Sequence, residues 1–321
     1  MFRSSADAPV VQLSEIPRPT LDASFRSRNC LCALGPSQVL VVGTSSTTGG
    51  TCYILNVMDM GTEKERLEVD SEFPHIFKSD RWPDHFKLEA PSVTRVSGNK
   101  VLTYGGAYGV DTSTEDMYML RLDKQTWSKA KNDHLISCLD STDGHPNRPM
   151  GLRNHFAVVL GGMYVVGGGI YDPAGGQTSM WGLDMKTGLW TRLPDVPGDL
   201  WMCSGMVVGD TLHALGEYSH YTYTHSGGWV TKSTDMHWMH NCRSQAILLG
   251  RHILVFGMKH ELYAYDTVSD EWQEWHIERL GGAAKTRCQI NRCSGVALGP
   301  DNILFIGDEG YAALLTVTHD T

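Results

Sequence analysis

The stretch 155–168, HFAVVLGGMYVVGG, decides the fold of this chain. Two runs of β-branched and other apolar residues flank the pair Gly161–Gly162, and the second run ends in another pair, Gly167–Gly168. Apolar runs joined by a two-residue glycine turn predict a β-hairpin. The stretch is therefore expected to form two adjacent antiparallel strands.

The same pattern recurs five more times along the 321 residues. The other copies are CLCALGPSQVLVVG ending at Gly43, SVTRVSGNKVLTYGG at Gly105 and Gly106, MCSGMVVGDTLHALG at Gly216, SQAILLGRHILVFG at Gly257 and CSGVALGPDNILFIG at Gly307. Successive copies end 41 to 62 residues apart. A repeat of this length indicates one sheet per copy, stacked against its neighbours.

Aromatic residues follow each hairpin at similar places. The fifth copy is the clearest, with Tyr263 to Asp266 and then Trp272. Four short strands per repeat predict an all-β, six-bladed β-propeller with four-stranded antiparallel blades. Glycines at the ends of second strands let neighbouring blades approach closely, and the later Trp is expected to cover the apolar gap between blades.

The apolar run, the Gly-Gly pair, the spaced Tyr and the later Trp resemble kelch repeats over nearly the whole chain. Gly-Gly is intact at Gly105–Gly106 and Gly167–Gly168, whereas the glycines that end the other four copies are followed by Thr, Glu, Met or Asp. The resemblance implies a kelch-type propeller. One domain, 1–321, is expected, with blades at about 28–70, 90–131, 153–197, 201–234, 242–278 and 290–318 plus 9–16.

The N-terminus is expected to close the last blade. The sixth repeat ends with its third strand, 312–318, and a sheet left open there would expose an unpaired edge. Residues 10–17, VVQLSEIP, align one for one with residues 190–197, WTRLPDVP, the outer strand of the third blade. Residues 9–16 are therefore predicted to form the outermost strand of the last blade. The alternative is an unattached N-terminal tail.

Charge and composition favour a protein partner. The 27 basic and 36 acidic residues give a formal net charge of −9 without any Lys/Arg-rich run, which argues against nucleic acid or anionic membrane. No secretory or membrane-spanning stretch is visible, and the eight cysteines lack a disulfide spacing. A monomeric propeller with reduced thiols, in the cytoplasm or nucleus, is expected.

Long insertions fall on one predicted face, which indicates the binding face. Four blades carry an arginine just before or at the first strand, namely Arg28, Arg153, Arg243 and Arg292. If these side chains converge, their guanidinium groups suit an acidic partner segment. A similar placement of Arg in kelch propellers that hold acidic peptides supports this expectation. The alternative is local pairing of each Arg with a neighbouring blade.

Aromatic and imidazole side chains add to the expected partner-binding set. They are His155 beside the first strand of the third blade, and Tyr108, Tyr171, Tyr218 and His220 in the long insertions. Tyrosine suits recognition because it gives a large contact area at low entropic cost. Cys203 and Cys293 align with His155, and a soft metal could use such groups. Cysteine also fits crowded strands as a small apolar residue, and no metal or cofactor is expected.

Motifs for known enzyme classes are missing from the sequence, including Gly-x-Ser-x-Gly, phosphate-binding loops and His-Glu-x-x-His. No catalytic residue is therefore predicted. The sequence favours a non-catalytic module that binds a protein or acidic peptide on its loop-rich face. An enzyme or small-ligand binder that uses Arg, His and Cys at the mouth of a central channel is the alternative. A substrate receptor of a ubiquitin ligase, which would need a separate adaptor surface, is the third possibility.

Overall fold

The structure is a computed structural model of the chain. It describes residues 9–16, 30–45, 49–60, 66–70, 88–89, 91–108, 113–129, 148–171, 175–198, 200–234, 236, 246–257, 261–279, 293–307 and 312–318. These residues form β-strands and turns, and none of them forms a helix that could span a membrane. They fall into two compact units: unit 1 is Met1–Arg81 with Asn241–Thr321, and unit 2 is Trp82–His240.

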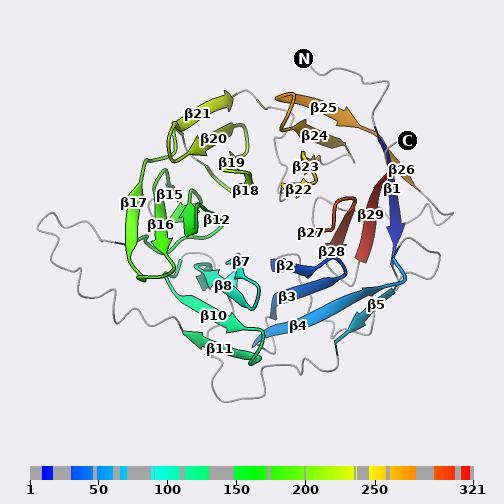
Figure 1. The fold of residues 1–321 in the computed structure, drawn as a ribbon, viewed down its shortest axis with the longest axis horizontal. Coiled ribbons are helices and arrows are strands. Elements are labelled where there is room, and N and C mark those ends of the chain that lie inside the picture. The colour runs from blue at the N-terminus through cyan, green and yellow to red at the C-terminus, as the bar shows by residue number, and fades with distance from the viewer. Residues whose placement is uncertain are drawn as a thin grey trace, which may run out of the picture. The chain divides into compact units, whose positions relative to one another are not determined.

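Unit 2 contains the second, third and fourth of six sheets, or blades, and each of these three has four antiparallel strands. Their strands, in spatial order, are β7 (Ser92–Ser97), β8 (Lys100–Tyr104), β10 (Met117–Arg121) and β11 (Thr126–Lys129); β12 (Phe156–Leu160), β13 (Met163–Gly167), β16 (Met180–Asp184) and β17 (Trp190–Leu193); and β18 (Ser204–Val208), β19 (Thr211–Leu215), β20 (His220–Thr224) and β21 (Gly228–Ser233). The first strand β12 contacts both β7 and β18 (Figure 1). Two short pairs, β6 (Leu88–Glu89) with β9 (Ala107–Tyr108) and β14 (Ile170–Tyr171) with β15 (Gly175–Gly176), complete the unit.

Unit 1 contains the first, fifth and sixth blades. Their strands are β2 (Cys30–Gly35), β3 (Gln38–Ser45), β4 (Gly49–Met58) and β5 (Arg66–Val69); β22 (Ile247–Leu249), β23 (His252–Phe256), β24 (Leu262–Asp266) and β25 (Glu271–Trp275); and β27 (Ser294–Leu298), β28 (Asn302–Ile306), β29 (Ala312–Thr318), β1 (Val10–Glu15) and β26 (Ile277–Arg279). The first strand β27 contacts β2 and β22.

The glycine turn that predicted the fold forms as expected. Leu160 pairs with Met163 across Gly161 and Gly162, whose φ angles are 57° and 80°. Positive φ at both central residues is the hairpin geometry that glycine adopts without steric cost. Alternate residues of β12 are buried, whereas four consecutive residues of β13 are buried. The second strand is therefore covered on both faces, which explains its continuous apolar run.

Consecutive blades of unit 2 meet where a second strand ends in glycine. The Gly106 amide donates to the Leu152 carbonyl at 2.7 Å, and the Gly169 amide donates to the Leu200 carbonyl at 2.8 Å. A Cβ on Gly105 would lie 2.3 Å from the Leu152 carbonyl oxygen, too close for any side chain. The predicted close approach at the glycine pairs is confirmed at both junctions.

Tryptophans of the fourth strands cover the gaps between blades, as predicted. The Trp190 ring on β17 lies 6.0 Å from Tyr104 of the preceding blade and 6.4 Å from Tyr164 of its own. Trp229 on β21 donates its indole N–H to the Pro194 carbonyl at 2.9 Å, at the end of the third blade. The Trp229 indole thus packs against its neighbours and also satisfies its single donor.

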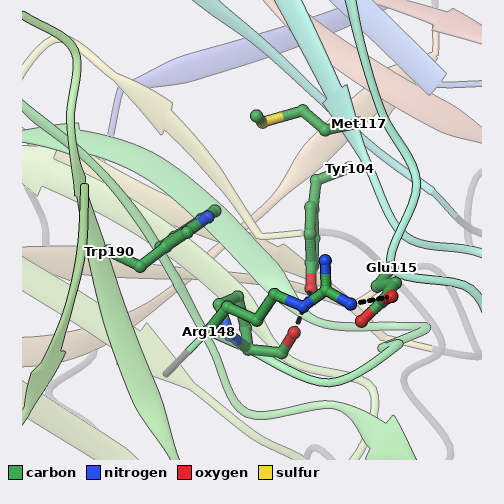
Figure 2. Close-up of a pocket in the computed structure, with 6 residues that line it drawn as sticks. Tyr104, Glu115, Met117, Arg148 and Trp190 are labelled. Carbon is green, nitrogen blue, oxygen red and sulfur yellow. Dashed lines mark hydrogen bonds and ion pairs between the residues drawn. The ribbon is translucent and has the colours of Figure 1, made fainter. Parts of the chain in front are cut away.

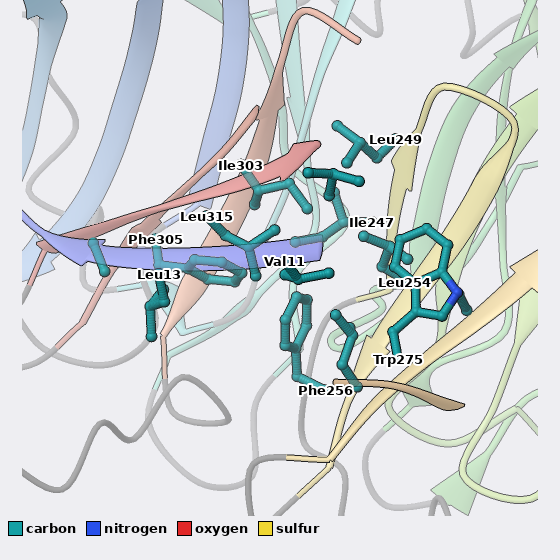
Figure 3. Close-up of a cluster of buried hydrophobic side chains, with 14 residues drawn as sticks. Val11, Leu13, Ile247, Leu249, Leu254, Phe256, Trp275, Ile303, Phe305 and Leu315 are labelled. Atoms are coloured by element: carbon teal, nitrogen blue, oxygen red, sulfur yellow. The ribbon is translucent and has the colours of Figure 1, made fainter. Parts of the chain in front are cut away.

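The N-terminal strand completes the sixth blade. β1 pairs antiparallel with β29 from Val10↔Thr318 to Glu15↔Ala313. Val11 and Leu13 are buried in an apolar cluster with residues of the fifth and sixth blades, including Phe256 and Phe305, whose rings lie 4.9 Å apart (Figure 3). One detail differs from the prediction, because β26 pairs in parallel with β1 and takes the outermost position. The chain leaving the fifth blade follows the free edge of β1 and covers it.

Removing residues 1–16 is expected to lower the melting temperature by on the order of 10 °C. The truncation exposes the edge of β29 and removes three buried side chains, Val11, Leu13 and Ile16, each worth roughly 1.5–3 kcal/mol. Thermal unfolding followed by circular dichroism measures the change. Removing only residues 1–8, which precede β1, is the matched control, and equal melting temperatures for the two truncations would contradict the assigned role of β1.

Gly105→Ala is expected to destabilise the chain by at least about 2 kcal/mol more than Gly188→Ala. Both glycines have positive φ, 67° and 74°, so both substitutions carry backbone strain. Only at Gly105 would the added Cβ also meet a backbone carbonyl, since nothing lies within 4 Å at Gly188. Urea denaturation of the two variants measures the difference, and similar unfolding free energies would argue against a tight junction.

Candidate functional site

The long loops of unit 2 gather at one end of its strands. Loops leave β8, β13 and β19 at the end where β7, β12 and β18 begin, so loop segments from all three blades lie there. We call this the loop-bearing end of unit 2. Amides of Thr114 and Gln177 donate to the carbonyls of Gly106 and Gly169 at 2.9 and 3.0 Å. These bonds hold the described parts of the loops close to the blade junctions.

Arg153 lies at this end, in the segment before β12. Its amide donates to the Ile170 carbonyl at 3.1 Å and its carbonyl accepts from the Ile170 amide at 2.9 Å. This backbone pair fixes Arg153 against β14, with the residue half-buried. Arg28, Arg243 and Arg292 lie outside the described residues, so convergence of the four arginines stays a prediction.

His155 is buried at the junction of the second and third blades. Its Nε2 lies 3.0 Å from the Ser92 hydroxyl, and its ring meets the Tyr104 ring edge-on at 5.4 Å. Burial lowers the pKa of His155 from 6.5 to about 3, although a backbone hydrogen bond at Leu152 acts in the opposite direction. A neutral imidazole that joins two blades favours a structural role over the predicted partner contact.

His220 is buried as well. It lies on β20, is fully enclosed, and places its Nε2 3.0 Å from Nδ1 of His213 on β19. The two rings pack with centroids 5.3 Å apart. The sequence suggested a surface loop at this position, whereas the strand begins at His220 itself and turns the ring inward. Burial therefore disfavours the predicted contact between His220 and a partner.

Cys203 has the properties of a packing residue. Its thiol donates to the carbonyl oxygens of Asn154 and Gly167 at 3.5 and 3.7 Å. Burial raises the pKa of the Cys203 thiol to about 12. Since the thiolate is the form that ligates metals or attacks electrophiles, this neutral thiol is suited to neither reaction.

The predicted tyrosines have different surroundings. Tyr171 is half-buried on β14 beside Arg153's backbone partner Ile170. Tyr218 is half-buried and donates its hydroxyl to the Glu217 carboxylate at 3.2 Å. Tyr108 belongs to β9, and its side chain lies outside the described part of the structure. Tyr171 and Tyr218 therefore keep surface that a partner could contact.

Sequence reasoning missed the adjacent pair Trp201 and Met202, which lies in the loop before β18. Their side chains are 47% and 48% exposed. The other large apolar residues exposed in the described part of the chain, Leu189, Val230 and Val268, are isolated along the sequence. The pair occupies the positions before β18 that Arg153 and Asn154 occupy before β12, so an apolar residue stands here where four other blades carry the arginine that drew attention to this position.

Backbone geometry fixes both side chains. A Cβ on Gly176 would lie 2.1 Å from Nε1 of Trp201, so the indole lies directly on the backbone of β15. Met202 has φ of 44°, and Asn154 at the aligned position has φ of 53°. Left-handed conformation is unusual for methionine and holds its side chain in a defined direction. We call these two exposed apolar side chains, which are adjacent in the sequence, the Trp201–Met202 patch.

Acid is expected to destabilise the wild-type chain more than a His155→Gln variant. Because the pKa of His155 is lower in the folded chain than in the unfolded chain, the unfolded chain binds the proton more readily. The contribution of His155 to the free energy of unfolding is therefore complete above pH 6.5 and falls as the pH drops toward 3. Between pH 7.5 and 5 the wild type should lose about 2 kcal/mol more than the variant. Urea denaturation at the two pH values measures this, and equal losses would show that His155 is protonated in the folded chain.

Comparison with known proteins identifies the fold. No protein-family model matches the chain, and no curated protein matches its sequence. A solved structure described as "Structure of YjhT" is similar over 95% of this chain and 99% of that chain, with a TM-score of 0.57 and 13% sequence identity. Together with the six four-stranded antiparallel blades, this likeness shows that the chain has the six-bladed β-propeller fold.

Proposed function

We propose that this protein is a binding module that holds a segment of a partner protein at the loop-bearing end of unit 2, with the Trp201–Met202 patch as its anchor. The observation that carries the proposal is the exposure of two large adjacent apolar side chains on fixed backbone. Isolated exposed apolar residues need no explanation, but a contiguous apolar surface favours an interaction site.

The geometry of the patch suits recognition because its residues lose little conformational freedom when a partner binds. Trp201 rests on Gly176, so its indole is arranged before a partner arrives, and the left-handed backbone of Met202 fixes the direction in which its side chain leaves the main chain. Preorganisation reduces the entropic cost of association. Tryptophan is among the residues that contribute most to binding energy at protein interfaces, and methionine adapts to irregular apolar partners.

Chemistry at this end favours binding over catalysis. His155 is a buried imidazole with a pKa of about 3, and Cys203 is a thiol with a pKa of about 12. Neither group is poised for proton transfer or nucleophilic attack near pH 7. We also propose that the partner segment is acidic, because Arg153 lies at the same end of unit 2. Membership of the kelch family, a cytoplasmic or nuclear location and a role as a ubiquitin-ligase receptor stay hypotheses.

The double variant Trp201→Ser, Met202→Ser is expected to retain partners at least roughly tenfold less well than the wild type in quantitative affinity capture. The matched control is Leu189→Ser, Val230→Ser, which removes two apolar side chains of similar exposure, 45% and 52%, from other places in unit 2. The control should retain every partner. Equal capture by the wild type and both double variants would show that the patch is not the anchor.

A further inference from the structure

A small pocket lies between the second and third blades of unit 2. It is lined by Tyr104, Glu115, Met117, Arg148, Pro149 and Trp190. Figure 2 shows the Tyr104 ring between Met117 and Arg148. Trp190 and Glu115 lie on opposite sides of this ring. With Arg148 in place, the free space is about that of one water molecule, so a side-chain-sized group would have to take the place of Arg148.

Most of the lining is electron-rich. Trp190 and Tyr104 present aromatic rings with centroids 6.0 Å apart, and the buried Met117 contributes a polarizable thioether. Tyr104 shares its hydroxyl proton between the carbonyls of Pro149 and Met150, at 3.1 and 2.9 Å. Aromatic faces and carbonyl oxygens attract cations and disfavour anions.

One cation already occupies the rim. Arg148 donates from Nη2 to Oε1 of Glu115 at 2.5 Å, and the two side chains are 33% and 42% exposed. Exposed ion pairs contribute little net free energy, because water solvates the separated charges well. The pair is therefore exchangeable, and Arg148 shows that a guanidinium group fits beside Glu115.

The Glu115 carboxylate is the anionic group of the pocket lining, and Arg148 is its cationic partner. The pKa of the Tyr104 hydroxyl is raised well above its usual value, first by burial and then by the Glu115 carboxylate. Arg148 acts in the opposite direction and has a smaller effect than Glu115. Once Arg148 moves away, Glu115 is the remaining charged group of the lining, and its carboxylate attracts a second positive group.

We propose that this pocket binds a cationic group, a guanidinium or alkylammonium on a partner's side chain, which replaces Arg148 on Glu115 and packs against Trp190. The aromatic wall supplies the cation–π contact, and the carboxylate supplies the ion pair. The site is distinct from the Trp201–Met202 patch, and it does not depend on the function proposed for that patch.

Titration with methylguanidinium chloride tests the site. The reporter is the Trp190 indole N–H in protein labelled with ¹⁵N-tryptophan, assigned with Trp190→Phe, at ionic strength held constant with NaCl. The wild type should give a saturable chemical-shift change. Glu115→Gln should lower the affinity at least tenfold, because it removes the carboxylate. Arg148→Ala should raise it at least threefold, because it removes the competing guanidinium.

The two variants change the affinity for methylguanidinium in opposite directions only if the ligand replaces Arg148. If the ion pair were merely structural, breaking it by either substitution would change the affinity in the same direction. Asp195→Asn is the matched control, because it breaks the exposed Arg192–Asp195 pair of the same unit and should leave the affinity unchanged. Sodium acetate should give no saturable shift. Absence of a shift with methylguanidinium, an equal response to acetate, or weaker binding by Arg148→Ala would each overturn the proposal.

Discussion

The close approach of consecutive blades at their glycine pairs is the constraint on which the rest of unit 2 depends. At Gly105 and Gly106 the backbone of the preceding blade lies so close to the Leu152 carbonyl that no side chain fits between them. The Gly106 amide donates a hydrogen bond to this carbonyl. The junction at Gly169 repeats this bond with Leu200. Close packing of this kind is stiff, because neither a backbone carbonyl nor a strand can shift without breaking ladder bonds. The first strands are therefore held in contact.

Fixing the junctions also fixes the loops that follow them. The segment after Leu152 pairs through Arg153 with β14, and the segment after Leu200 brings Trp201 onto Gly176 of β15. The same backbone plan thus presents different side chains at successive blades: a guanidinium at one and an indole at the next. Variation at these positions changes what the loop-bearing end can bind while the underlying hydrogen bonds stay the same, which is how a repeated scaffold acquires a specific surface.

The repeat made the blades predictable from sequence, because turn glycines and strand alternation are local signals. The N-terminal strand was predictable for a related reason, since residues 10–17 align one for one with residues 190–197 and the sixth repeat ended at its third strand, beside which β1 pairs. The outer position of β26 had no such signal, being set by the path of the chain between blades. The burial of His155 and His220 could not be read from the sequence, because each ring lies beside a hydrogen-bonding partner, Ser92 or His213, that a single sequence does not bring together.

The two candidate sites of unit 2 differ in what holds them ready. The Trp201–Met202 patch is apolar surface supported from below by Gly176, so its occupant gains mainly from removing apolar area from water. The pocket beside Trp190 already contains a cation of its own, and an occupant gains only by the difference between its contacts with Glu115 and those of Arg148. Such exchange favours selectivity over affinity, because a neutral or anionic group cannot displace Arg148 without leaving Glu115 unpaired. A partner that used both sites would therefore be anchored at the patch and discriminated at the pocket.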